Sequence, residues 1–305
     1  MQIVIHELCK TYAGGVQALK NVNLDISSGM FGLLGPNGAG KSTLMKILAC
    51  LEVLTSGEVL LNGQSIQTQR KQIRACLGYL PQFFGVYPRL TGLEFLTYVT
   101  KLSPHPPQNL KQRVQETLAN VGLLEAGDRK VKTYSGGMLR RLGIAQALIN
   151  DPELLIIDEP TVGLDPEERI RFRNLLTEIS RDKIIILSTH IVGDISSTCK
   201  DLALLSNGSV IYRGHPQELI QKAGGKVWRV ECDESDFQSI AEQMQIISSI
   251  SKERHVLLRV VGEPMPQFNM QSMPPNLEDA YMFFMAQEAG ERVEEEPALV
   301  ESGPR

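Results

Sequence analysis

The sequence predicts an α/β domain whose parallel sheet is wound by helices, followed by a small α+β domain. A glycine-rich stretch, residues 35–43, follows an apolar run of strand length at 30–34 and precedes an apolar run of helical character at 44–51. Farther along, residues 154–157 and 183–188 are continuous apolar runs of strand length. Such runs suit central parallel strands, which are covered on both faces, and ligands bind at the ends of these strands.

Composition limits the function classes. The chain has 305 residues, 42% hydrophobic and 22% charged, with a net charge of −4, so it can bury a sizeable core and is not a nucleic-acid binder by bulk electrostatics. Its five cysteines are scattered without a CxxC pair, which disfavours a zinc site or a disulfide framework and indicates a reducing, cytosolic compartment. No apolar run approaches the roughly 18 residues of a membrane span, and the N-terminus lacks signal-peptide character. At a membrane, another polypeptide would have to do the spanning.

The stretch GPNGAGKST matches the pattern GxxxxGK[ST], which cradles a nucleotide phosphate between a strand and a helix. Glycines let backbone N–H groups turn inward, and the helix N-terminus adds partial positive charge. Lys41 can then reach the β- and γ-phosphates, and the Ser42 hydroxyl can ligate Mg²⁺. A plain turn before a core helix is the alternative, but chance produces this pattern in roughly one such chain in a hundred. The predicted phosphate-binding residues are Gly35, Pro36, Asn37, Gly38, Ala39, Gly40, Lys41, Ser42 and Thr43.

Tyr12 precedes this loop and is followed by the turn Ala13-Gly14-Gly15. Taken alone, it is best interpreted as an ordinary surface or packing tyrosine. Ahead of a phosphate loop, its ring could instead supply a flat face on which adenine stacks.

Several shorter elements complete the predicted first domain. Thr91 is a candidate helix N-cap with Glu94 three residues on, the pattern of a capping box. The composition from about residue 83 to 150 is helical and suggests a helical insert in the α/β domain. Strands are expected at 2–8, 22–26, 57–63 and 75–80, and a further helix at 109–121.

The character of the chain changes near residue 215. Residues 216–287 are predicted to form an α+β accessory domain, following an α/β domain over residues 1–215. Its expected strands are 227–231, 246–250 and 255–261, and its expected helices are 236–243 and 276–286. Residues 288–305 hold six glutamates and two arginines with proline and glycine, and we expect them to be disordered.

Four further segments join the phosphate loop in a fixed order. They are Gln82, the stretch YSGGM at 134–138, the DEP sequence that closes the run at 154–157, and His190 after the run at 183–188. Each alone has a plain interpretation, such as a loop glutamine, a helix cap or a core histidine. In this order, over about residues 1–215, they resemble the ATP-binding subunit of ABC transporters, with the parallel core, antiparallel β-subdomain and helical insert of that P-loop NTPase type.

The resemblance implies a role for each residue in an ATPase with ATP and Mg²⁺ as ligands. Lys41 and the loop amides would hold the phosphates, and Tyr12 would stack on adenine. Ser42, Gln82 and Asp158 would hold Mg²⁺, Asp158 mostly through water. Glu159 would accept a proton from the attacking water or orient it, and His190 would hydrogen-bond the γ-phosphate.

The resemblance also implies a dimer. Ser135, Gly136 and Gly137 would face the γ-phosphate of ATP held by a second copy, so that ATP joins the copies and hydrolysis releases them. Asp165 would lie in a loop that crosses the interface. The usual LSGGQ is here YSGGM, with Tyr134 and Met138 in place of leucine and glutamine, and we expect the site to stay competent because the serine and glycines remain.

A separate transmembrane permease is the second implied partner, which would hold this subunit at the cytoplasmic face of the membrane. The aromatic stretch after Gln82, FFGVYPRLTGLEFL, would form part of a groove for that permease. Residues 275–285, PNLEDAYMFFM, resemble the C-terminal ends of bacterial exporter ATPases and favour export. The alternatives are a soluble ABC-type ATPase acting in translation or DNA maintenance and an unrelated P-loop kinase or GTPase. The single cassette and the absence of long coiled coils or an NKxD motif disfavour both.

Overall fold

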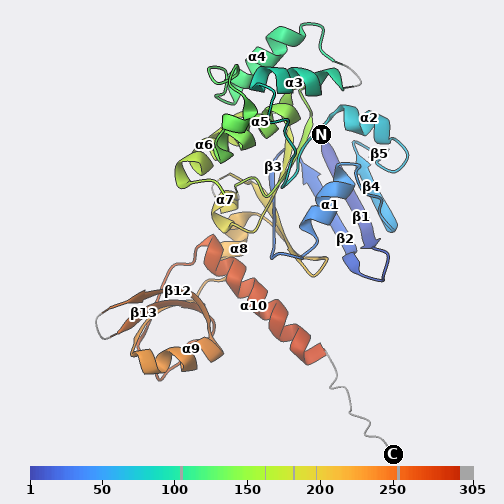
Figure 1. Cartoon of the computed structure of the whole chain (residues 1–305). Coiled ribbons are helices and arrows are strands. Elements are labelled where there is room, and N and C mark those ends of the chain that lie inside the picture. The colour runs from blue at the N-terminus through green and yellow to red at the C-terminus, as the bar shows by residue number, and fades with distance from the viewer. Residues whose placement is uncertain (104–105, 162, 181–182, 197, 253–254, 296–305) are drawn as a thin grey trace, which may run out of the picture. The chain divides into compact units, whose positions relative to one another are not determined.

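The computed structural model describes the chain except residues 104–105, 162, 181–182, 197, 253–254 and 296–305, and for 289–295 it describes only the helical backbone. The chain divides into two compact units, Met1–Gly214 and His215–Arg305. The first unit holds two sheets and the second unit one, and each unit is described separately below (Figure 1).

The first unit is built on a six-stranded sheet in the order β10-β9-β3-β8-β7-β6. Five strands run parallel, and only β10 pairs antiparallel, with β9. Both β7 and β8 are buried at every position, as their unbroken apolar sequences predict, and the predicted α/β class is confirmed. The strands are β3 (Gly29–Leu34), β6 (Leu77–Leu80), β7 (Leu154–Asp158), β8 (Ile184–Thr189), β9 (Asp201–Ser206) and β10 (Ser209–Gly214).

A smaller antiparallel sheet, in the order β2-β1-β4-β5, forms the β-subdomain of this unit. Its alternating buried residues share one apolar core with helix α1 (Lys41–Leu48) and with part of the parallel sheet. Strands β1 and β2 run beyond the short apolar stretches that predicted them because their polar alternate residues face solvent, whereas β4 ends two residues before its predicted end. The strands are β1 (Gln2–Thr11), β2 (Gln17–Ser27), β4 (Ser56–Leu61) and β5 (Gln64–Ser65).

Helices cover the parallel sheet, and α3, α4 and α5 gather at one end of the unit (Figure 1). The predicted capping box at the start of α3 is present, because Thr91 accepts from the Glu94 amide and Glu94 accepts from the Thr91 amide. Residues 70–75 form a helix that the sequence did not predict, since only Ile73 of this charged segment is buried. Besides α1, the helices are α2 (Arg70–Ala75), α3 (Gly92–Lys101), α4 (Leu110–Asn120), η1 (Val131–Thr133), α5 (Gly136–Leu148), α6 (Pro166–Ile179) and α7 (Val192–Ser196).

The second unit is a four-stranded antiparallel sheet, in the order β12-β13-β11-β14, with helices on both faces. On β13, Leu258 and Val260 are buried in one core with Ile240 of α9. The alternate residue Arg259 points the other way and hydrogen-bonds Asp279 of α10. The elements are α8 (Pro216–Lys222), β11 (Val227–Cys232), η2 (Glu234–Asp236), α9 (Phe237–Gln243), β12 (Gln245–Ser251), β13 (Val256–Val261), β14 (Met270–Ser272) and α10 (Leu277–Glu295).

Two features of this unit differ from the sequence-based expectation. Strand β14 lies in residues 262–275, a segment rich in proline and methionine that has no alternation of apolar and polar residues to predict a strand, and it pairs with β11. Helix α10 continues beyond the predicted end at 286 to Glu295, because Gly290 is followed by good helix formers. The expectation of disorder over 288–305 is therefore wrong for 288–295, and residues 296–305 lie outside the described part of the chain.

The ion pair between Arg259 and Asp279 gives a test of the second unit. Asp279 is fully buried, and both of its oxygens accept hydrogen bonds from Arg259, at 2.8 and 2.6 Å. We expect Asp279→Asn to lower the free energy of unfolding by about 2–3 kcal/mol, because it leaves a partly buried guanidinium without its counter-charge. Urea denaturation measures the loss. The matched change Glu278→Gln, at an exposed neighbour, should stay within about 0.5 kcal/mol of the wild type, and equal losses in both variants would contradict the assignment.

Candidate functional site

The phosphate loop connects β3 to α1 in a backbone conformation that requires glycine. Gly40 has a φ of 105°, and a Cβ there would lie 2.5 Å from the carbonyl oxygen of Ala18. A Cβ on Gly35 would lie 2.2 Å from the carbonyl oxygen of Leu205. No side chain caps the start of α1, so its first amides remain available to an anion.

Lys41, the first residue of α1, is buried at the base of this loop. Its Nζ donates to the carbonyl oxygens of Gly35 at 2.7 Å and Pro36 at 3.1 Å, and it lies 3.5 Å from Oε1 of Glu159. Burial lowers the pKa of the Lys41 ammonium, and the neighbouring carboxylates of Glu159 and Asp158 oppose that shift. A phosphate group entering the loop would add further negative charge at this cation.

Two acidic residues and a histidine lie at the ends of β7 and β8. Glu159, directly after β7, is 4% exposed, and its Oε2 lies 2.7 Å from Nδ1 of His190, directly after β8. Asp158, 2% exposed, accepts a hydrogen bond from the hydroxyl of Ser188. The carboxylate of Glu159 thus joins Lys41 on one side to His190 on the other.

Lys41 and Glu159 border a cavity of about 380 Å³. It contains most of the phosphate loop together with Gln82 and Glu159, which the sequence placed in one site from positions far apart. Ala18 also lines it, a residue for which the sequence offers no signal. Among the described residues, the lining comprises Ala18, Asn37, Gly38, Ala39, Gly40, Lys41, Ser42, Thr43, Gln82 and Glu159.

Tyr12 lies beside this cavity. Its hydroxyl is 3.3 Å from Oγ1 of Thr43, its side chain is 37% exposed, and Lys10 Nζ lies 4.8 Å from the ring centroid. The ring is therefore next to the phosphate loop and accessible, as stacking on a base requires.

The segment 134–138 is not part of the cavity. Ser135 caps α5 by accepting from the Met138 amide at 3.2 Å, and both Ser135 and Gly136 are exposed. Gly137 is buried against Glu168, where a Cβ would come within 2.8 Å of its carboxyl group. Tyr134 is buried, and its hydroxyl donates to the carbonyl oxygen of Ala126 at 2.8 Å. Asp165 similarly caps α6, by accepting from the Glu168 amide.

Sequence reasoning passed over Arg140, which is buried beside the site. Its guanidinium donates to carbonyl oxygens at the end of β7 and just after β6. The available signal was a charged residue inside a mostly apolar helix, but the acceptors are backbone groups, which no side-chain pattern reveals.

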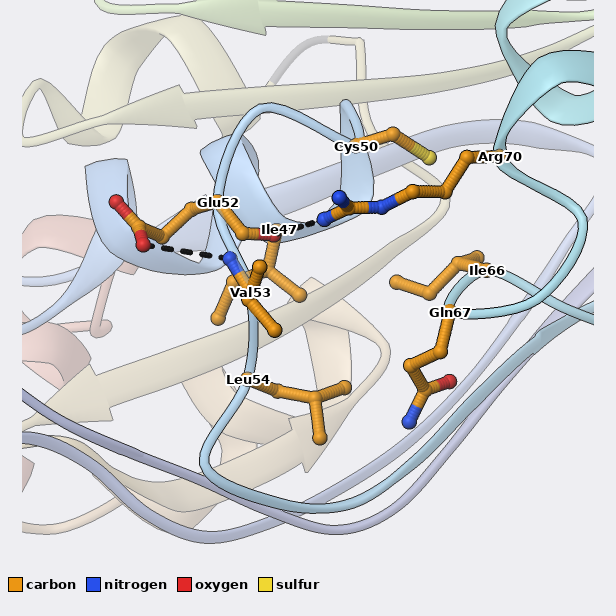
Figure 2. A pocket seen from close by; sticks show the side chains of 8 residues that line it. All are labelled: Ile47, Cys50, Glu52, Val53, Leu54, Ile66, Gln67 and Arg70. Carbon is orange, nitrogen blue, oxygen red and sulfur yellow. Dashed lines mark hydrogen bonds between the residues drawn. The ribbon is translucent and has the colours of Figure 1, made fainter.

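A separate hollow of about 110 Å³ lies near the end of α1 (Figure 2). Its polar side chains are already engaged: Arg70 donates to the carbonyl oxygen of Glu52 at 3.4 Å, and Glu52 accepts from Lys10 at 2.8 Å. The remaining lining is mainly apolar, and we assign no function to this hollow.

Comparisons with known proteins find a matching family model, related sequences and a related structure. The family model described as "ABC transporter" matches residues 19–162. The chain is 36% identical over 247 residues to an uncharacterized ABC transporter ATP-binding protein, YxlF, of Bacillus subtilis, covering 81% of each chain. It is 34% identical to the Nod factor export ATP-binding protein I of Cupriavidus metallidurans, covering 86% of this chain and 90% of the relative. The dimeric ATP-binding cassette MJ0796 bound to ADP and Pi superposes with a TM-score of 0.64 at 28% identity, over 70% of this chain and 98% of the cassette.

The position of Tyr12 predicts a contribution to nucleotide affinity. We expect Tyr12→Ala to raise the dissociation constant of ATP about fivefold or more, the lower end of what stacking of a base on an aromatic ring contributes. Fluorescence titration with a labelled ATP measures it. Tyr12→Phe keeps the ring and loses only the contact with Thr43, so it should change the constant less than about threefold. If Tyr12→Phe weakens binding as much as Tyr12→Ala, the hydroxyl and not the ring carries the effect.

Proposed function

Because the chain belongs to the ABC transporter ATP-binding proteins, we propose that it hydrolyses ATP as one half of a dimer and drives a separate transmembrane permease. The observation that carries this proposal is that Lys41 and Glu159 line one cavity 3.5 Å apart, and that His190 hydrogen-bonds Glu159. The second part of the site, Ser135 to Gly137, lies outside that cavity.

The arrangement suits transfer of a phosphoryl group to water. Lys41 and the loop amides stabilise negative charge on the phosphates. Glu159 orients the attacking water or accepts a proton from it. His190 orients Glu159 through the bond between Nδ1 and Oε2, while the exposed edge of its ring would face the γ-phosphate.

The residues present fit a magnesium ion. Ser42 and Gln82 line the cavity with hydroxyl and amide oxygens, and the buried carboxylate of Asp158 lies at the end of the adjacent strand. Hard oxygen donors of this kind are those that Mg²⁺ prefers. When bound with ATP, the ion would neutralise charge on the phosphates.

A dimer is supported by the placement of the YSGGM segment. Ser135 and Gly136 are exposed at the start of α5, where their polar groups are open to a second molecule. The related cassette MJ0796 is dimeric with ADP and Pi bound. In a dimer, the segment of one copy would close over the phosphate loop of the other.

The permease is supported by an apolar groove of about 410 Å³ beside α3. The rings of Tyr87 and Tyr98 pack edge to face within it, with centroids 5.4 Å apart, and Phe83, earlier in the same aromatic stretch, is 86% exposed. None of the helices in the described part of the chain has the length and hydropathy of a membrane span. A groove of this kind suits a short helix of a membrane partner at the cytoplasmic face. The name of the related Nod factor protein supports export as the direction.

We expect Glu159→Gln to trap the dimer. The change keeps the shape of the side chain and removes its basicity, so hydrolysis should fall about 10²- to 10⁴-fold while ATP still binds. Size-exclusion chromatography with Mg-ATP should then show dimer where the wild type shows monomer. Glu167→Gln, at an exposed glutamate paired with Arg171, should behave as the wild type. Only monomer in the Glu159→Gln sample would contradict the composite site.

The groove gives a second test. We expect Phe83→Ser combined with Tyr87→Ser to leave the ATPase rate of the isolated subunit unchanged and to abolish co-purification with the proposed permease. Removing the aromatic side chains takes away the apolar contact area on which a docked helix depends. Ile170→Ser, at an exposed apolar residue of α6, is the control and should retain co-purification. Retention by the groove variant would place the permease contact elsewhere.

A further inference from the structure

Arg140 holds together the two loops that carry the reactive groups of the site. It lies one turn into α5 and is 8% exposed. It donates five hydrogen bonds, as many as a guanidinium has N–H groups. All five acceptors are backbone carbonyl oxygens. They belong to Pro81, Gln82, Asp158, Glu159 and Pro160.

These acceptors come from two segments far apart in the sequence. Nη1 donates to Pro81 at 3.2 Å and to Gln82 at 2.8 Å, in the loop after β6. Nε donates to Pro160 at 2.8 Å and Nη2 to Asp158 at 3.0 Å and also to Glu159, in the turn after β7. One side chain of α5 therefore fixes the backbone at both Gln82 and Glu159.

The turn after β7 needs such support. Glu159 has a φ of 48°, in the left-handed region, although it is not glycine and precedes a proline. Such a conformation persists only where the surroundings hold it. The amide of Glu159 donates to the carbonyl oxygen of Ser188 at 3.0 Å, and Arg140 binds the carbonyl oxygen on the other side of the residue.

The burial of the Arg140 charge also indicates that its hydrogen bonds to the two loops are important. Within the described part of the chain, no carboxylate lies within ion-pair distance of this guanidinium, and burial lowers the pKa of Arg140 while Asp158 and Glu159 oppose that shift. Burying a cation that only carbonyl groups bind is costly, and an apolar residue at this position would avoid the cost. The bonds to the two loops offset it.

We propose that Arg140 is a positioning residue that places Glu159 for its contact with the attacking water and couples the loops of Glu159 and Gln82 to the start of α5, where Ser135 to Gly137 are presented. This inference rests on the proposed function, because it assigns Arg140 a part in that reaction. A shift of the loops at the γ-phosphate would be transmitted through these five bonds to the segment that meets the second copy.

The test compares Arg140→Gln with Arg113→Gln in the full chain. Arg113 is matched in chemistry, because its Nε donates to the carbonyl oxygen of Ile149 at 2.9 Å, at the other end of α5 and away from the cavity. We expect Arg140→Gln to bind Mg-ATP as the wild type does and to lose kcat about 10- to 100-fold, since small misplacements of reacting groups cost that much. In the Glu159→Gln background, it should raise the ATP concentration for half-maximal dimerisation about tenfold. Arg113→Gln should leave kcat and dimerisation unchanged.

Several outcomes would overturn the proposal. They are an unchanged kcat or an unchanged ATP requirement for dimerisation in folded Arg140→Gln, weakened ATP binding with kcat intact, or an equal loss in Arg113→Gln. If Arg140→Gln does not fold, Arg140→Lys, which keeps the cation and three donors, is measured in the same way. Failure of both to fold would assign Arg140 to folding alone and so overturn the positioning role. A wild type that neither binds nor hydrolyses ATP would overturn the proposed function itself, and this inference with it.

Discussion

The register of three parallel strands is the constraint on which the site depends. Asp158 of β7 pairs with Ser188 of β8, and Ser188 pairs with Leu33 of β3, so the three strands end in nearly the same row. The phosphate loop, Glu159 and His190 each follow within a few residues of that row. A slip of one residue in a strand would turn its side chains to the opposite face and separate the groups that now meet.

The buried charged groups that the chemistry of this edge requires lower the stability of the fold. Lys41, Glu159 and Arg140 are all buried, and burial of a charged group is unfavourable unless polar partners replace water. Backbone carbonyl groups replace water as partners of Lys41 and Arg140. Lys41 and His190 replace water as partners of Glu159. The unfavourable φ of Glu159 adds to the same cost, which the apolar core around the strands has to offset.

The fold class and the phosphate loop could be predicted because their signals are local, whereas the other candidate site residues were predicted from the resemblance of an ordered set of segments to a known family. A strand, a glycine-rich loop and a helix start adjoin in the sequence around Lys41, and unbroken apolar runs mark β7 and β8. The elements that were missed lack such signals. Helix α2 buries only Ile73, and β14 depends on pairing with β11, which is a tertiary contact. The role of Arg140 was invisible for a related reason, since its acceptors are carbonyl groups of residues 18 to 59 positions away.

The division of the chain separates the chemistry of the phosphates from the packing of the C-terminal unit. Every described residue that lines the phosphate cavity lies between Ala18 and Glu159, and His190, which contacts Glu159, also belongs to the first unit. The C-terminal unit has its own sheet, a separate apolar core and a buried ion pair between Arg259 and Asp279. These residues are therefore committed to the packing of their own unit. Because none of the residues described in that unit lines the cavity, an influence of this unit on ATP turnover would act through the movement or association of the first unit.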